Sequence, residues 1–191
     1  MRLAITVFTL VVFMGAAMLL PSAINEWLTF DRSAIQAGEF WRLLSGHFNH
    51  HNAAHYVMNM AGLVALSWVF ADLLTPAALL RLVVLLVISI SLGMWLDNNL
   101  QRYVGFSGVL HGLLVYVLVL GLRGNPVLHG LALAIVGWRL FLEQQPDYDR
   151  LYLAPLMDAP VYVNAHLWGA ISGLAAALIV LGWRLRPSAL A

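Results

Sequence analysis

The chain has 191 residues, of which 62% are hydrophobic and only 10% are charged, and this is the composition of a membrane protein rather than of a soluble domain. The formal net charge is +1, there is no lysine and no basic run, so nothing indicates a nucleic-acid partner. Because the sequence contains no cysteine, disulfides, thiolate catalysis and cysteine-based zinc sites are excluded.

Six apolar segments are each near the length that crosses a bilayer as a helix: 3–22, 53–72, 77–96, 107–122, 126–142 and 161–183. We therefore expect an all-α membrane protein, a bundle of six transmembrane helices in a single domain over 1–191 with a long first extracytoplasmic loop. The first segment has one arginine, an apolar stretch and small residues near its end, so it also resembles a signal peptide. Cleavage would leave five spans, and this alternative stays open.

The arginines favour one orientation of the predicted spans. Five of them fall beside span ends on one side: Arg2, Arg81, Arg123, Arg184 and Arg186. The other side holds most of the acidic residues and the two long links, 23–52 and 143–160. The positive-inside rule then predicts that both termini are cytoplasmic.

Four polar residues are predicted to lie at one depth in the membrane. With six spans, the second, fourth and sixth helices run from outside to inside, and a helix rises about 1.5 Å per residue. Counted from the charged residue that ends each helix, Asn59 lies about 20 Å up, Ser107 about 24 Å, His55 about 25 Å and His166 about 27 Å. Since the hydrocarbon layer is about 30 Å thick, all four lie just beneath the outer surface.

Glycines on the fourth and sixth helices indicate that these helices can meet. Two pairs are spaced four residues apart, Gly108 with Gly112 and Gly169 with Gly173. Small residues at this spacing let membrane helices approach backbone to backbone, so Ser107 and His166 could share a hydrogen bond. The alternative is that the glycines serve packing alone.

These residue types fit serine hydrolysis. The hydroxyl of Ser107 needs a base, and a histidine such as His166 is the usual one. His55 and Asn59 share one helix face and, with the backbone N–H of Ser107, could stabilise an oxyanion. Because no acidic residue is expected at this depth, we predict a Ser–His dyad and not a triad, and we expect no metal or organic cofactor.

The chain resembles the rhomboid family of intramembrane serine proteases in four motifs that occur in family order. They are "EFWR" with Trp41 and Arg42, "HHNAAHYVMN" with His50, His55 and Asn59, "GFSG" with Gly105, Ser107 and Gly108, and "AHLWGAISG" with His166, Gly169 and Gly173. The resemblance implies that Ser107 is the nucleophile and His166 the base. It also implies a cavity open to the periplasmic side of a bacterial inner membrane, where transmembrane segments of membrane-anchored proteins are cleaved.

One position departs from the pattern of many bacterial rhomboids, because His111 stands where they carry a tyrosine. We expect His111, one turn below Ser107, to stack on His166 or to influence its protonation by like-charge repulsion, and its action as the base is an alternative. The "SGVLHG" histidine, the small size and the "NAH" before the last helix resemble the rhombosortase branch. That branch is thought to process C-terminal sorting tails with a Gly-Gly-type motif.

Two other functions remain as alternatives. The runs "HFNHH" and "HNAAH" resemble the histidine boxes of di-iron membrane oxidases, although such sites need several boxes. Our preferred interpretation places His47, His50 and His51 at a hydrated entrance to the cavity and His129 near the cytoplasmic face. We also expect His50 to support the active site, either by bracing the first loop or by bonding near the serine. The second alternative is a non-catalytic rhomboid relative that acts as a binding or quality-control factor, although such relatives lack the serine or the histidine that this chain keeps.

Overall fold

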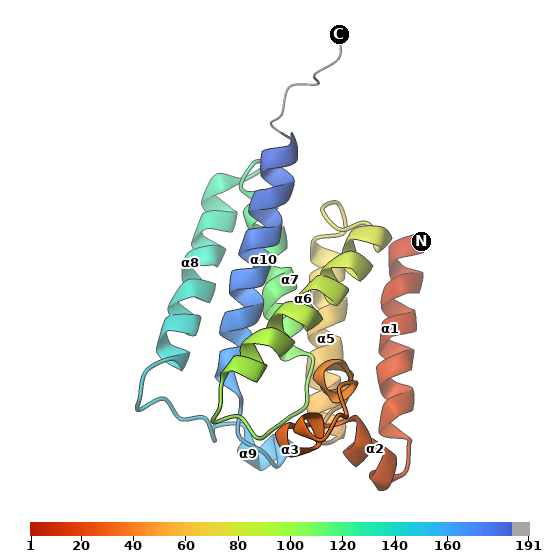
Figure 1. The fold of residues 1–191 in the computed structure, drawn as a ribbon. Coiled ribbons are helices and arrows are strands. Elements are labelled where there is room, and N and C mark those ends of the chain that lie inside the picture. The colour runs from red at the N-terminus through yellow and green to blue at the C-terminus, as the bar shows by residue number, and fades with distance from the viewer. Residues whose placement is uncertain (185–191) are drawn as a thin grey trace.

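The computed structural model describes residues 1–184, and its longest elements are six helices that form a bundle (Figure 1). They are α1 (Arg2–Met18), α5 (Ala53–Val69), α6 (Pro76–Leu96), α7 (Ser107–Gly121), α8 (Pro126–Glu143) and α10 (Val163–Arg184). Each coincides with a predicted apolar segment to within a few residues. By length and composition, α6, α8 and Val163–Trp183 of α10 could cross a membrane, while α1, α5 and α7 are shorter apolar helices.

Side-chain caps explain where three of these helices begin. The side chain of Asn52 accepts a hydrogen bond from the backbone of His55 at the start of α5, and Thr75 and Asn125 cap α6 and α8 in the same way. A proline in the first turn of α6 and of α8 suits a position whose N–H has no helical partner. By contrast α7 has no side-chain cap, and its first residue is Ser107 itself.

The centre of the bundle is the contact between α7 and α10, and it depends on the two glycine pairs. A Cβ atom added to Gly169 would collide with the carbonyl oxygen of Gly108, and one added to Gly173 would collide with that of Gly112. Backbone therefore lies directly against backbone, as small residues allow in membrane helices. The predicted close approach of these helices is confirmed.

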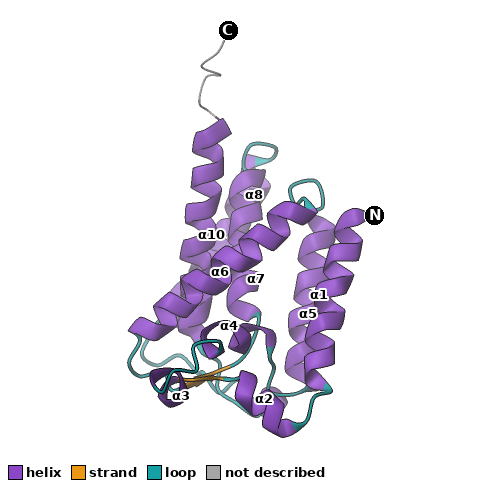
Figure 2. Cartoon of the chain, turned by 45° about the vertical axis from the view of Figure 1, so that its right-hand side comes forward, coloured by secondary structure: helices purple, strands orange, loops and turns teal. Residues whose placement is uncertain are grey.

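The first link is compact rather than an open loop. Short elements follow one another here: α2 (Ser22–Leu28), β1 (Phe30–Asp31), α3 (Arg32–Gln36), α4 (Arg42–Ser45) and a 3₁₀ turn, η1 (Gly46–Phe48). Strand β1 pairs in antiparallel fashion with β2 (Arg102–Tyr103), with Phe30 opposite Tyr103 (Figure 2). This pairing joins the first link to the segment that leads into Ser107.

Two motif residues hold this link together and lie outside the pocket described below. The guanidinium of the buried Arg42 donates to the backbone carbonyls of Glu26, at 2.6 Å, and Thr29, at 2.9 Å, and binds the Glu39 carboxylate. The indole N–H of Trp41 donates to the carbonyl of Trp27 at 3.2 Å. The "EFWR" motif is therefore a bracket for the first link.

The N-terminus and the end of α10 lie at one end of the bundle, and the first link and α9 (Ala154–Met157) lie at the other (Figure 1). Of the arginines that predict orientation, Arg186 is outside the described residues. Helix α8 is the most exposed of the long helices, and only Leu140 and Glu143 are buried on it. A buried acidic residue at the end of an exposed apolar helix is unusual, and Glu143 is therefore considered with the candidate site below.

Candidate active site

The backbone before α7 is shaped to present Ser107 beside α5. Gly105 has φ = 133°, a conformation that favours glycine, and a Cβ there would lie 2.8 Å from Cε1 of His55. Its N–H donates to the carbonyl of Gly46 at 3.0 Å, and its carbonyl accepts from the Tyr103 hydroxyl at 2.6 Å. The turn into α7 is thus held from both sides and packed on His55.

The hydroxyl oxygen of Ser107 lies 3.0 Å from Nε2 of His166 on α10. His166 is 5% exposed, and the close glycine contact between α7 and α10 brings the two side chains together. The hydrogen bond predicted between these two residues is confirmed.

The prediction that no acidic residue lies at this depth is wrong. Nδ1 of His166 lies 2.9 Å from Oε2 of Glu143, whose side chain is only 1% exposed. In the sequence, Glu143 follows the predicted span 126–142 and falls in the acidic link, and the depth estimate covers only the second, fourth and sixth helices. Helix α8 continues to residue 143 and delivers this carboxylate to the back of the histidine.

Arg139, one turn earlier on α8, completes the environment of this carboxylate. Its Nε lies 3.0 Å from Oε1 of Glu143, and its Nη2 donates to the hydroxyl of Tyr152 at 2.8 Å. The guanidinium also lies over the rings of Tyr148, at 5.3 Å, and Tyr152, at 5.2 Å. Arginine can only donate, so Oε1 acts as an acceptor and the pair favours an ionised Glu143.

These contacts fix the tautomer of His166. A carboxylate oxygen can only accept, so the hydrogen of the neutral imidazole lies on Nδ1, facing Glu143. Nε2 then carries the lone pair and accepts the hydroxyl hydrogen of Ser107. The arrangement is a hydrogen-bonded chain from Ser107 through His166 to Glu143.

His111 lies on the other face of the His166 ring. The ring centroids are 4.0 Å apart and the planes differ by 16°, so the predicted stacking is confirmed. Nδ1 of His111 donates to the backbone carbonyl of Ser107 at 2.8 Å. Since the Ser107 hydroxyl is paired with His166 instead, this geometry does not favour His111 as the base.

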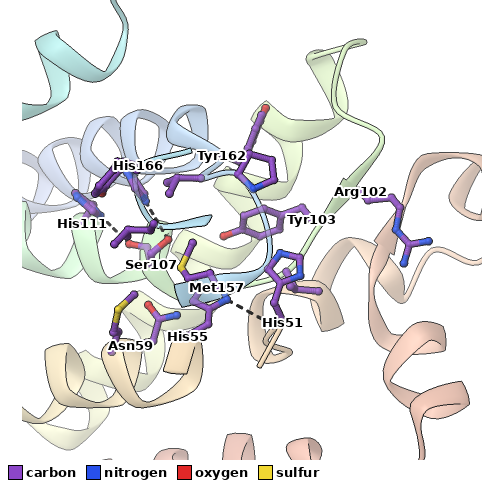
Figure 3. A pocket seen from close by; sticks show the side chains of 16 residues that line it. His51, His55, Asn59, Arg102, Tyr103, Ser107, His111, Met157, Tyr162 and His166 are labelled. Atoms are coloured by element: carbon purple, nitrogen blue, oxygen red, sulfur yellow. Dashed lines mark hydrogen bonds between the residues drawn. The ribbon is translucent and has the colours of Figure 1, made fainter. Parts of the chain in front are cut away.

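His55 and Asn59 of α5 face Ser107 across the pocket, as Figure 3 shows. Both side chains are buried, and the side-chain nitrogen of Asn59 has no hydrogen-bond partner among the described residues. The imidazole Nδ1 of His55 receives only a long contact, 3.5 Å, from the backbone nitrogen of His51. Two donor-bearing side chains are therefore poised beside the serine.

A pocket of about 200 Å³ contains these groups. Ser107, His166, His111, His55 and Asn59 all line it, and Glu143 does not, because it lies behind His166. The link after α8 closes one side with Met157 of α9 and with Val161. That closure is fastened to α5 by Asn52, whose amide donates to the carbonyl of Leu156 at 3.0 Å and to the Asp158 carboxylate at 3.1 Å.

The histidine run before α5 does not form a common entrance, which corrects that prediction. His47 is fully buried and bonded to Ser91 of α6 at 3.0 Å, and only the exposed His51 lines the pocket. His50 packs against the rings of His55 and Tyr56. Burial lowers the pKa of both His47 and His50 to about 3, so these two are neutral near pH 7.

The last of the histidines, His129, does not line the pocket, and the structure also bears on the di-iron alternative. His129, near the start of α8, bonds to the carbonyl of Asn125 at 2.8 Å and packs against Gly121. Within residues 1–184 there is no group of three or more histidine, aspartate or glutamate side chains placed to hold a metal ion, so the geometry does not support a di-iron site.

Comparison with known families agrees with this architecture. Residues 37–183 match the Rhomboid domain, which is well over half of the chain. The match begins in the first link, ahead of the Arg42 bracket, and includes all of the pocket-lining residues. No curated protein matches the chain.

Proposed function

This chain belongs to the rhomboid family of intramembrane proteases, and from that premise we propose that it is a serine endopeptidase with Ser107 as nucleophile and His166 as base. The observation that carries the proposal is the 3.0 Å contact between the Ser107 hydroxyl and Nε2 of His166, whose other ring nitrogen lies 2.9 Å from the Glu143 carboxylate. A hydroxyl becomes a useful nucleophile when a positioned base can take its proton.

The steps follow from the positions of the groups. Ser107 Oγ attacks the scissile carbonyl while its proton passes to Nε2 of His166. The scissile C–N bond then breaks as the same proton goes to the leaving amine nitrogen, and the acyl group stays on Ser107 as an ester, the acyl-enzyme. The oxyanion is stabilised by the side chains of Asn59 and His55 and by the backbone N–H of Ser107. This N–H is free to donate because it lies in the first turn of α7 and has no helical partner. Water then attacks the acyl-enzyme while His166 takes its proton. The ester bond to Ser107 Oγ breaks, the proton returns to Oγ, and the new C-terminal carboxyl group of the substrate is released.

The substrate must be extended at the site of cleavage. A helix with its side chains is about 10 Å wide, and a cavity of about 200 Å³ holds only a short stretch of unwound chain or several waters. Entry beside α8, the most exposed long helix, is compatible with a transmembrane substrate. Helix α9 closes one side of the pocket, so admitting substrate on that side would require α9 to move and the hydrogen bonds that Asn52 donates to Leu156 and Asp158 to break.

Within the rhomboid family, we propose that the chain belongs to the rhombosortase branch and that its substrates are C-terminal sorting tails. A Gly-Gly-type motif lacks side chains and unwinds readily, which suits a narrow pocket. The corresponding topology is one domain of six membrane spans in a bacterial inner membrane, with cytoplasmic termini and the pocket on the periplasmic side. The acyl group can pass to water or to an amine of another molecule, and the choice depends on what enters the pocket.

Fluorophosphonate labelling of the detergent-purified protein tests the proposal without a known substrate. We expect labelling of the wild type at Ser107 and none in Ser107→Ala or His166→Ala. Labelling that persists in His166→Ala and disappears in His111→Ala would move the base to His111. A folded wild-type protein that does not label would instead support the non-catalytic alternative.

A further inference from the structure

The side chain of Glu143 has an environment that a surface ion pair does not need. One oxygen binds Arg139 on the same helix at 3.0 Å, and the other binds His166 on α10 at 2.9 Å. Its side chain is 1% exposed, against 43% for Arg139. An i,i+4 pair alone would be equally well formed at the surface, whereas burying a carboxylate is costly unless it is fully paired.

We propose that Glu143 is a positioning residue that completes a Ser107–His166–Glu143 triad; this rests on the proposed function. The carboxylate holds the imidazole with its hydrogen on Nδ1, so that Nε2 is free to receive the Ser107 proton. When that proton arrives, His166 carries a positive charge next to the carboxylate, which stays ionised. No proton moves to Glu143, and Arg139 balances the charge of the carboxylate when His166 is neutral.

The change Glu143→Gln separates this role from simple packing, because Arg139 decides how a glutamine would point. The guanidinium can only donate, so it selects the amide oxygen and turns the amide NH₂ group towards Nδ1 of His166. The imidazole then places its hydrogen on Nε2, the wrong nitrogen for a base facing Ser107. In a serine protease of another fold, the analogous acid-to-amide change lowers kcat about 10⁴-fold.

We expect the fluorophosphonate labelling rate of Glu143→Gln to fall by about 10²–10⁴-fold, with Glu143→Asp partly restoring it. The matched control is Glu39→Gln, the same change in a Glu–Arg pair of the first link that does not contact His166. Nitrogen NMR of histidine-labelled protein gives an independent readout. The hydrogen of His166 should lie on Nδ1 in the wild type and on Nε2 in Glu143→Gln.

A purely structural role would lower the melting temperature of Glu143→Gln and leave both the labelling rate of the folded fraction and the tautomer unchanged, and that result would overturn the proposal. If Glu143→Gln does not fold, the wild-type spectrum still decides, since a hydrogen on Nε2 of His166 contradicts the triad. The wild-type protein could also show the His166 hydrogen on Nδ1 and yet fail to label at Ser107. That outcome would refute the protease function but not the hydrogen bond between Glu143 and His166.

Discussion

Adding one methyl group at Gly169 should open the contact on which the site depends. A Cβ at this position would lie 2.9 Å from the carbonyl carbon of Gly108 and 3.3 Å from the nitrogen of Gly112, and closer still to the Gly108 oxygen. These atoms are backbone, so no side chain can turn aside. Since carbon atoms in contact are about 3.5–4.0 Å apart, the carbon contact alone requires α7 and α10 to separate by roughly 0.6–1.1 Å, and the closer oxygen contact requires at least as much.

That separation is enough to break the hydrogen bond between Ser107 and His166, which begins at 3.0 Å and is lost beyond about 3.5 Å. A misplacement of about 1 Å can reduce catalysis about 10²-fold. We therefore expect Gly169→Ala to lower the fluorophosphonate labelling rate by about 10–10²-fold. Overpacking should also destabilise the bundle by about 1–3 kcal/mol.

The chain offers a matched control on the same helix. A Cβ added to Gly182 meets no atom within 4 Å, so Gly182→Ala should label like the wild type and gain up to about 1 kcal/mol from helix propensity. The assay compares labelling rates and melting temperatures of both variants in one detergent. Wild-type labelling by Gly169→Ala, or an equal loss in Gly182→Ala, would refute the link between glycine packing and the active serine.

Three further predictions concern other contacts of the site and its support. His111→Tyr should keep most of the labelling because an aromatic ring still stacks on His166, whereas His111→Ala should reduce it; equal rates would deny the stacking a role. Burial holds the pKa of His50 at about 3, while an unfolded histidine takes up its proton near pH 6.5. The free energy of unfolding should therefore decrease as the pH is lowered from 6.5 towards 3, and His50→Phe should weaken that dependence in melting curves. Arg42→Gln should lower the melting temperature by leaving carbonyls of the first link without donors, at about 1–3 kcal/mol each, and an unchanged melting temperature would contradict the bracket.

The parts of the site that the sequence predicts are those that depend on counting along one helix. Ser107 and His166 could be placed at one depth because rise per residue is constant, and the glycine spacing showed which two helices can meet. The identity of the long helices followed from apolar length alone. None of these features depends on the order in which the helices pack.

The parts that the sequence did not predict depend on contacts between distant segments. The pairing of Phe30 with Tyr103 involves strands of two residues, too short for any periodic pattern. His47 belongs to a histidine run that indicates hydration, yet the folded first link buries it against Ser91. Glu143 was one residue beyond the predicted span, and the i,i+4 spacing from Arg139 was the signal that could have kept it on the helix.

The position of Glu143 also explains how two stacked histidines can have different tasks. The rings of His111 and His166 are 4.0 Å apart, and at this distance two positive charges would repel strongly. Only His166 contacts a carboxylate, while Nδ1 of His111 is bonded to the uncharged carbonyl of Ser107. If Glu143 completes the triad, the positive charge that forms during catalysis is stabilised on His166, and His111 serves as a neutral surface against which the base is held. Replacing the carboxylate by an amide would remove this distinction between the two histidines and would also move the hydrogen of His166 to Nε2. Glu143→Gln should therefore lower the labelling rate by more than the loss of one hydrogen bond would.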